Sequence, residues 1–204
     1  MSKTEIIICG SGGHTRSIIN LLDNYIIQGI YDDSYKSKTR DEVLGIPIKG
    51  NIEDIASSKY KIVFSVGDNI KRKILYKRFE NRALIKNLLH SYSIIEKSVK
   101  MGNSNQIFAN SYINSDSIIG DNNIFNSGCI VEHESSIGNH NHIAVGAIIC
   151  GRVKIEDECF LGAGSVIKEK INICSNVIIG ANSLVLNDVT EPGIYVGNPI
   201  KKIK

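Results

Sequence analysis

The chain has 204 residues, of which 42% are hydrophobic and 22% are charged, and its formal net charge is +3 at pH 7. This composition excludes a disordered chain, because enough apolar residues are present to form a core. The positive charge is small and scattered, so it does not indicate a nucleic-acid-binding protein, and we expect the three lysines of the tail (Lys201, Lys202 and Lys204) to be solvated.

The cysteines and the hydropathy pattern indicate a cellular compartment. The five cysteines are odd in number, form no CxxC pair and stand where small apolar residues would serve: Cys9, Cys129, Cys150, Cys159 and Cys174. We expect buried free thiols in a reducing environment. The sequence shows no leader and no run of about eighteen apolar residues, so we expect a soluble, cytoplasmic protein with no membrane partner.

The first 85 residues or so have the pattern of a short nucleotide-binding unit. Residues 5–9 are expected to form a buried strand, residues 16–24 a helix, residues 28–31 a second strand and residues 61–66 a third, and a basic helix containing Lys71, Arg72 and Lys73 follows. Strands that alternate with helices predict a parallel sheet with crossover helices.

A glycine-rich loop follows the first strand. Gly10, Ser11, Gly12, Gly13 and His14 depart from G-x-G-x-x-G, because Thr15 takes the third glycine position. Asp32 and Asp33 lie about twenty residues after the loop, where a dinucleotide fold places its ribose-binding acid. The loop alone is also compatible with a plain strand–helix turn. Too few strands follow for a complete NAD site, so we expect a ligand with one nucleotide, its phosphates over the loop amides.

A six-residue repeat occupies the second half. In a frame that starts at residue 95, the first position is apolar in sixteen consecutive blocks: Ile95, Met101, Ile107, Ile113, Ile119, Phe125, Val131, Ile137, Ile143, Ile149, Ile155, Leu161, Ile167, Ile173, Ile179 and Val185. With 42% apolar residues, chance would give this in one fixed frame about once in a million. An antiparallel sandwich would not keep one frame for so long, so the repeat predicts a parallel β-helix of a little over five coils.

Two other block positions indicate how such a coil turns. The second position is often glycine (102, 120, 138, 162 and 180), and the fifth is mostly small or β-branched, as at Ser111, Cys129 and Val177. We expect the fifth residue to point into the narrow interior. We expect glycine or asparagine to occupy corners that need a positive φ, as at Asn122, Asn123 and Asn176.

One block contains residues that are suited to catalysis rather than to packing. In Val131–Ser136, His133 stands between two acids, Glu132 and Glu134, and the next block contains His140 and His142. A positioned imidazole with a neighbouring carboxylate is what a general base requires. The alternatives are a histidine on a surface corner and a zinc site, which we do not favour because the histidine spacings of seven and nine do not match a coil.

The chain resembles a known family from end to end. The motifs are GSGGH after the first strand, YDD after the second, VGDN after the third, and then NSGCIVEHE, HIAVGA, CGRVKI, LGAGSV and the terminal VGNP. Together they resemble the nucleotide-sugar N-acetyltransferases with a Rossmann-like N-terminal half, and equally the sialic acid O-acetyltransferases of the same layout. His90-Ser91, where the family usually has His-Pro, and Ile200 depart from the pattern.

The resemblance implies an α/β Rossmann-like domain (residues 1–88) followed by an all-β left-handed parallel β-helix (residues 89–204), and a homotrimer with active sites between subunits. It implies that His133 is the general base, that Glu134 orients it and that Asn126 positions the sugar. It also implies that acetyl-CoA binds at His142, Gly151, Ala163 and Ala181, and that no metal is required. The nucleotide sugar would bind the Gly10–His14 loop together with Asp32, Asp33, Asn69 and Arg72.

Three functions stay open from the sequence. The first is an acetyl-CoA-dependent N-acetyltransferase that acts on a nucleotide-linked 4-amino-4,6-dideoxy sugar for bacterial surface glycans. The second keeps the donor and uses a hydroxyl acceptor such as sialic acid. The third is a scaffold or metal-binding β-helix. The glycine loop and the Asp32-Asp33 pair favour the first.

Overall fold

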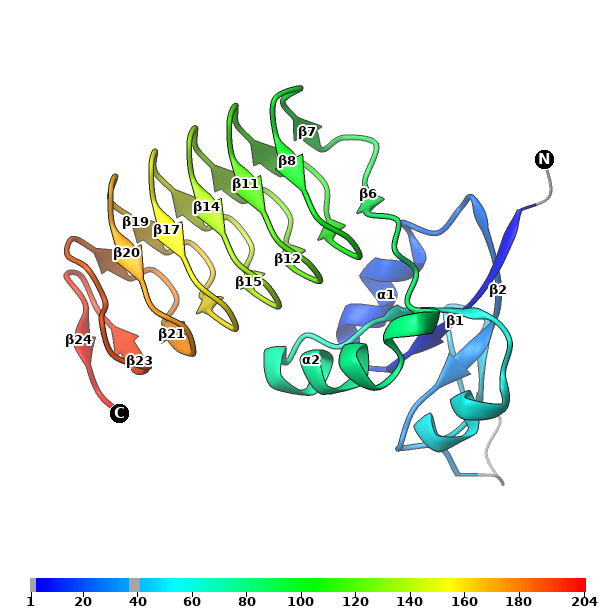
Figure 1. Cartoon of the computed structure of the whole chain (residues 1–204). Helices are drawn as coiled ribbons and strands as arrows, with labels where there is room; N and C mark the ends of the chain where they lie inside the picture. Colours follow the sequence, from blue (N-terminus) through cyan, green and yellow to red (C-terminus); the bar gives the residue numbers. More distant parts are fainter. Residues whose placement is uncertain (1–2, 37–40) are drawn as a thin grey trace. The chain divides into compact units, whose positions relative to one another are not determined.

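A computed structural model describes residues 3–36 and 41–204 and divides the chain into two units, Met1–Ile85 and Lys86–Lys204 (Figure 1). The boundary expected after residue 88 falls inside strand β6 (Leu88–Leu89), which pairs in parallel with β9 (Gln106–Ile107) of the second unit. None of the helices in the described part of the chain has the length and apolar character needed to cross a membrane.

The first unit is built on a five-stranded sheet in the order β3-β4-β2-β1-β5. Its strands are β1 (Thr4–Cys9), β2 (Tyr25–Tyr31), β3 (Glu42–Val43), β4 (Ile46–Gly50) and β5 (Lys61–Phe64). β1 pairs in parallel with β2 and β5, and β2 pairs in parallel with β4. β1 lies inside the sheet, between β2 and β5, and its apolar run from Ile6 to Cys9 is buried on both faces.

The helices of this unit are α1 (Gly13–Ile19), η1 (Ile52–Ser57), α2 (Asn69–Arg78) and η2 (Glu80–Arg82), where η marks a 3₁₀ helix. The prediction of a helix at 16–24 was wrong in its bounds. After Ile19 the chain closes in tight turns, with the N–H groups of Leu21 and Leu22 donating to the carbonyls three residues earlier. The β3–β4 hairpin was not predicted, because a two-residue strand carries almost no periodic signal.

The second unit is a parallel β-helix with three faces (Figure 1). Face I contains β7 (Ile94–Ile95), β10 (Tyr112–Ile113), β13 (Ile130–Val131), β16 (Ile148–Ile149), β19 (Val166–Ile167) and β22 (Leu184–Val185). Face II contains β8 (Lys100–Met101), β11 (Ile118–Ile119), β14 (Ser136–Ile137), β17 (Lys154–Ile155) and β20 (Asn172–Ile173). Face III contains β6, β9, β12 (Ile124–Phe125), β15 (His142–Ile143), β18 (Phe160–Leu161), β21 (Val177–Ile179), β23 (Gly193–Val196) and β24 (Lys201–Lys202).

The strand register confirms the predicted coil. Tyr112 pairs with Ile130, and Ile130 pairs with Ile148, so each coil takes 18 residues, or three blocks of six. The first residue of every block from Ile107 to Val185 is buried in one continuous core. Backbone hydrogen bonding runs from coil to coil, as expected of a stacked parallel fold.

The corners turn at the fourth position of the block rather than at the second. Asn122, Glu134 and Asn176 have φ values of 54°, 59° and 61°, as do the equivalent residues of most other blocks. The expectation of a positive φ was therefore right for Asn122 and Asn176 and wrong for Asn123. Gly120, at the second position of its block, is required for a different reason: a Cβ there would lie 2.7 Å from the carbonyl oxygen of Gly138 in the next coil.

Asn123 instead belongs to a buried ladder at one corner of the helix. Asn105, Asn123 and Asn141 occupy the fifth position in successive coils and are fully buried. The Oδ1 of each accepts a hydrogen bond from the backbone N–H of the residue one coil later, and the distance from the Asn123 N–H to Asn105 is 2.9 Å. The ladder satisfies buried backbone donors from within the coil.

The C-terminal tail closes the helix. β23 pairs in parallel with β21, and β24 then pairs antiparallel with β23. Lys201, Lys202 and Lys204 are exposed, as expected, and Lys202 also donates to Glu191 at the surface, at 2.7 Å. An antiparallel end strand stops the ladder of parallel strands and covers an edge that would otherwise invite pairing with another chain.

Candidate active site

The predicted base stands on the corner between faces I and II, which joins β13 to β14. His133 takes the third position of its block, and Glu134 the fourth, where its positive φ of 59° turns the chain. The Nδ1 atom of His133 lies 2.9 Å from Oε2 of Glu134, and both side chains are about half exposed. The carboxylate thus fixes one ring nitrogen and leaves Nε2 to act on a proton.

The next coil supports this pair from the C-terminal side. Gly151 and Arg152 lie 18 residues after His133 and Glu134, and the N–H of Arg152 donates to the carbonyl of His133 at 2.9 Å. A Cβ on Gly151 would lie 2.9 Å from both Cε1 and Nε2 of His133, so the imidazole ring lies directly against this glycine. The guanidinium of Arg152 donates to Oε2 of Glu134 from Nε and Nη2, at 3.0 and 2.9 Å.

The charges around this corner are mostly on carboxylates. Hydrogen bonds from Arg152 and from His133 hold the pKa of Glu134 below its ordinary value. Glu132 accepts a hydrogen bond from Asn114 at 2.6 Å. Burial raises the pKa of Cys150, and the charges of Glu132 and Glu169 raise it further, so this thiol is not activated as a nucleophile.

All five cysteines are free, as expected. Cys9, Cys129 and Cys159 are buried, whereas Cys150 and Cys174 are partly exposed. Burial raises the pKa of each of the three buried thiols to about 12. No cysteine in the described chain therefore offers a thiolate for a covalent acyl intermediate.

The other predicted catalytic and donor-binding residues lie elsewhere on the same β-helix. Asn126, Ala163 and Ala181 lie on the corner between faces III and I, and His142 lies on face III with its ring 5.1 Å from that of Phe160. Asn126 caps its own corner, because its Oδ1 accepts the N–H of Ser127 at 2.9 Å. One chain therefore brings together His133, Glu134 and Gly151, and does not bring Asn126, His142, Ala163 or Ala181 to them.

His140 lies on a third corner, between faces II and III. It has a φ of 59°, is buried, and its Nδ1 lies 2.9 Å from Nδ2 of Asn122. His133 and His140 are thus on different corners. Within residues 3–36 and 41–204, no group of three histidine, cysteine or acidic side chains is arranged to hold a metal ion.

In the first unit, Asp32 holds the glycine loop. Its Oδ2 accepts the N–H of Ser11 at 2.7 Å, and its Oδ1 accepts the N–H of Ser34 at 2.8 Å. Partial burial raises the pKa of Asp32, but the hydrogen bonds from Ser34 and Ser11 outweigh it and hold the pKa below its ordinary value. Both carboxylate oxygens are engaged with the backbone, whereas Asp33 is exposed.

Thr15 explains the departure from the glycine motif. Its hydroxyl donates to the carbonyl of Gly10 at 2.9 Å and accepts from the hydroxyl of Ser65, also at 2.9 Å. Gly10 itself has a φ of 109°, and a Cβ there would lie 2.6 Å from the carbonyl oxygen of Ser65. The loop is therefore fixed against β5, with glycine where the backbones approach most closely.

Asn69 and Arg72 begin helix α2 after β5. Arg72 is fully buried, and its guanidinium donates to the carbonyl of Val66 at 3.0 Å and to Oδ1 of Asn69 at 2.9 Å. Burial lowers its pKa to about 9. The expectation that Arg72 binds the nucleotide sugar is corrected by this geometry, since a fully buried guanidinium has no surface left for a ligand; it supports the turn between β5 and α2.

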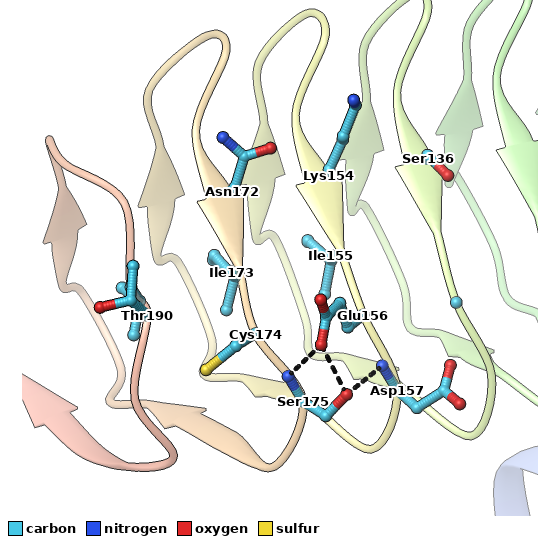
Figure 2. Close-up of a pocket in the computed structure, with 12 residues that line it drawn as sticks. Ser136, Lys154, Ile155, Glu156, Asp157, Asn172, Ile173, Cys174, Ser175 and Thr190 are labelled. Atoms are coloured by element: carbon cyan, nitrogen blue, oxygen red, sulfur yellow. Dashed lines mark hydrogen bonds between the residues drawn. The ribbon is translucent and has the colours of Figure 1, made fainter.

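A separate groove of about 670 Å³ crosses the last coils, on face II and its corner with face III (Figure 2). Its rim carries Lys154 and Asn172, and the N–H and hydroxyl of Ser175 both donate to Glu156 at 2.9 Å. None of the residues predicted for catalysis or for donor binding lines it. We therefore place the candidate active site at the His133 corner.

Comparison with known proteins agrees with both units. Residues 5–79 match the PglD N-terminal domain, residues 134–169 match the bacterial transferase hexapeptide (six repeats), and residues 152–187 match the hexapeptide repeat of succinyl-transferase. A histidine-to-asparagine variant of perosamine N-acetyltransferase from Caulobacter crescentus, in complex with CoA and GDP-perosamine, is similar with a TM-score of 0.89 and 25% identity, over 100% of this chain and 98% of that one. The chain is an acyltransferase with a PglD N-terminal domain followed by transferase hexapeptide repeats.

Two further proteins are similar to this acetyltransferase chain. The acetyltransferase domain of PglB from Neisseria gonorrhoeae shares its fold, with a TM-score of 0.90, 24% identity, and coverage of 98% of this chain and 99% of that one. An uncharacterised protein of Acanthamoeba polyphaga mimivirus is 38% identical over 114 residues. The match takes in 54% of this chain and 22% of that curated relative, so the chain spans about a fifth of its length.

Sequence reasoning missed two polar residues that hold this acetyltransferase's candidate sites. Arg152 was overlooked because it lies 18 residues from Glu134, although the six-residue frame predicts that residues one coil apart are neighbours. Ser34 was overlooked because a serine after an Asp-Asp pair is an ordinary turn residue.

Proposed function

We propose that this chain is an acetyl-CoA-dependent N-acetyltransferase that acetylates the amino group of a nucleotide-linked 4-amino-4,6-dideoxy sugar. The observation that carries the proposal is the half-exposed His133–Glu134 pair, with its Nδ1–Oε2 distance of 2.9 Å, on a hexapeptide β-helix. The similarity to a perosamine N-acetyltransferase bound to CoA and GDP-perosamine supports the substrate class.

In this mechanism His133 is the general base. The sugar amine attacks the thioester carbonyl carbon of acetyl-CoA, and Nε2 of His133 takes the proton that the amine nitrogen loses. The C–S bond then breaks, the proton passes to the departing thiolate, and the products are the N-acetyl sugar and CoA. Glu134 keeps the proton of the neutral imidazole on Nδ1 and stabilises the imidazolium that forms.

Backbone donors support the binding of acetyl-CoA. Among the described residues, none accepts a hydrogen bond from the N–H of Gly151, Ala163 or Ala181. Ser115 and Ser127, at the same block position, have this N–H capped by the preceding asparagine. We infer that Ala163 and Ala181, stacked one coil apart, bind the pantetheine arm together with His142. We assign the Gly151 N–H to the developing oxyanion.

A homotrimer would complete the site. The corner with His133 and the corner with Ala163 and Ala181 are the two edges of face I, so one chain holds them apart. A cyclic trimer with face I toward its axis would place the first corner of one copy beside the second corner of the next. Asn126 would then reach the sugar from the neighbouring subunit.

The first unit would hold the nucleotide. The Gly10–His14 loop and Asp33 lie at the carboxyl ends of β1 and β2, where parallel sheets bind such ligands. Because both oxygens of Asp32 already accept backbone hydrogen bonds, we give the loop-holding role to Asp32 and the contact with the ribose or base to Asp33. Asn69 would lie nearby. We place the enzyme in the cytoplasm, in bacterial surface-glycan synthesis.

The test is to incubate the protein with acetyl-CoA and UDP-, dTDP- and GDP-linked amino sugars and to follow the release of CoA. We expect turnover with at least one amino sugar. We expect His133→Asn to lose about 10²–10⁴-fold in kcat, the usual contribution of a general base. His90→Asn, a change in the first coil, is the matched control and should keep its activity. Turnover on sialic acid and on none of the amino sugars would replace this proposal with an O-acetyltransferase.

A further inference from the structure

We propose that Arg152 is a positioning residue that holds Glu134 in line with His133 and limits how strongly this carboxylate favours the charged imidazole. The inference rests on the proposed function for its catalytic meaning. The contacts themselves do not depend on the substrate, because they lie within two successive coils of one chain.

The side chains of His133 and Arg152 both contact a single oxygen atom of Glu134. Oε2 of Glu134 lies 2.9 Å from Nδ1 of His133, 3.0 Å from Nε of Arg152 and 2.9 Å from Nη2 of Arg152. Both Glu134 and Arg152 turn their corners with a φ near 60°, at the same block position. The backbone bond from Arg152 N–H to the carbonyl of His133 fixes the register between them.

The contact does little for the fold. The side chains of Arg152 and Glu134 are 50% and 48% exposed, and solvent-exposed ion pairs contribute little to stability. The charges of such a pair act instead on a neighbouring proton transfer. Without Arg152, no guanidinium would offset the negative charge of Glu134, and this charge would act in full on His133.

The other charges on this corner are mostly negative. Glu132, Glu169 and Asp116 are acidic, the last one coil before Glu134 on the same column, and Lys170 lies one coil after Arg152. Of the cations among the described residues, Arg152 is the one with a hydrogen bond to Glu134. Its removal therefore leaves the base among carboxylates and favours the imidazolium form.

The expected direction follows from the charge. A general base acts only when it is neutral, so a change that favours the imidazolium moves the acid limb of the kcat/KM profile to higher pH. Glu134 lies between Arg152 and His133, and the site is solvated. For the loss of one charge at this separation, we expect the acid limb of the Arg152→Gln profile to move by about 0.5 to 1 pH unit. Arg152→Lys keeps the charge and loses the two-nitrogen contact, so its acid limb should stay near that of the wild type while kcat falls.

The experiment measures pH profiles of acetyl transfer for the wild type, Arg152→Gln and Arg152→Lys, with Lys170→Gln as a control that removes a cation from the same column. In parallel, NMR follows the titration of the histidine ring nitrogens, with the His133 signals identified by their loss in His133→Asn. We expect both readouts to move to higher pH in Arg152→Gln and to stay in place in Lys170→Gln.

Two results would overturn the inference. One is an unchanged NMR titration in Arg152→Gln, and the other is an equal displacement in Arg152→Gln and Lys170→Gln, which would indicate a general charge effect. The NMR arm needs no substrate. If the wild type transfers no acetyl group, the proposed function fails while the role of Arg152 is still decided.

Discussion

At the scale of single residues, the absence of a side chain at Gly151 makes room for the imidazole ring of His133. The ring of His133 lies where a Cβ of residue 151 would be 2.9 Å from Cε1 and Nε2, closer than such atoms pack. We expect Gly151→Ala to turn the imidazole away and to lower kcat/KM by about tenfold to a hundredfold, since a displacement of about 1 Å costs this much in a positioned site. The steady-state kinetics of the purified variant would measure it.

The fold should tolerate this change, because Gly151 does not have a positive φ and the His133 ring is half exposed and can move. Cys150→Ala is the matched control, since it alters the neighbouring position and removes a thiol with no proposed role. An unchanged kcat/KM in Gly151→Ala would show that the ring position seen here is not the active one.

The sequence predicted the contact between His133 and Glu134 at this corner, but not the residues that support it. His133 and Glu134 stand together in the chain, so a histidine beside an acid could be recognised directly. Gly151 was predicted for its amide and not for the space that it leaves, because the contact with His133 depends on the stacking of two coils. Arg72 was predicted to bind a ligand, because it lies on a basic helix near a glycine loop. In the structure it is buried, and its guanidinium donates to the backbone carbonyl of Val66.

At the scale of the strand, the alternation in and out of the coil should determine stability. Ile118 and Ile119 are neighbours in β11, yet Ile118 is 53% exposed and Ile119 is 3% exposed. We expect Ile119→Ala to destabilise the protein by about 2–5 kcal/mol, the usual cost of a cavity in a packed core. Ile118→Ala should change stability by about 0.5 kcal/mol or less. Denaturant unfolding followed by circular dichroism would measure both, and equal effects would contradict the six-residue frame.

The strands were predictable because a strict period leaves a signal in every block. The corners were not, since a positive φ at the fourth position is accepted by Glu134, Arg152 and Lys170 as well as by asparagine and glycine. The buried asparagine ladder was also missed. Asn105, Asn123 and Asn141 interrupt the small or β-branched pattern of the fifth position, and this 18-residue spacing is the signal that would have revealed it.

At the scale of the whole molecule, the outer surface of face I predicts assembly. Its outward row is apolar in every coil: Ile94, Tyr112, Ile130, Ile148, Val166 and Leu184. The outward row of face II is mostly polar, with Lys100, Ser136, Lys154 and Asn172. A continuous apolar row on one face, beside a face whose row is mostly polar, is typical of a subunit interface.

We therefore expect the wild type to have a mass of about 67 kDa in solution, three times the 22.4 kDa of one chain. Ile148→Asp, in the middle of the stripe, should dissociate it, because burying three unpaired carboxylates near one axis is costly. Ser136→Asp places the same charge on face II and should leave the trimer intact. Light scattering coupled to size exclusion would measure all three masses.

The same variant tests where the active site lies. Because the corners with His133 and with Ala163 and Ala181 are opposite edges of face I, the Ile148→Asp monomer should also lose acetyl transfer while keeping its circular dichroism spectrum. A monomeric variant with full activity would place the whole site within one chain.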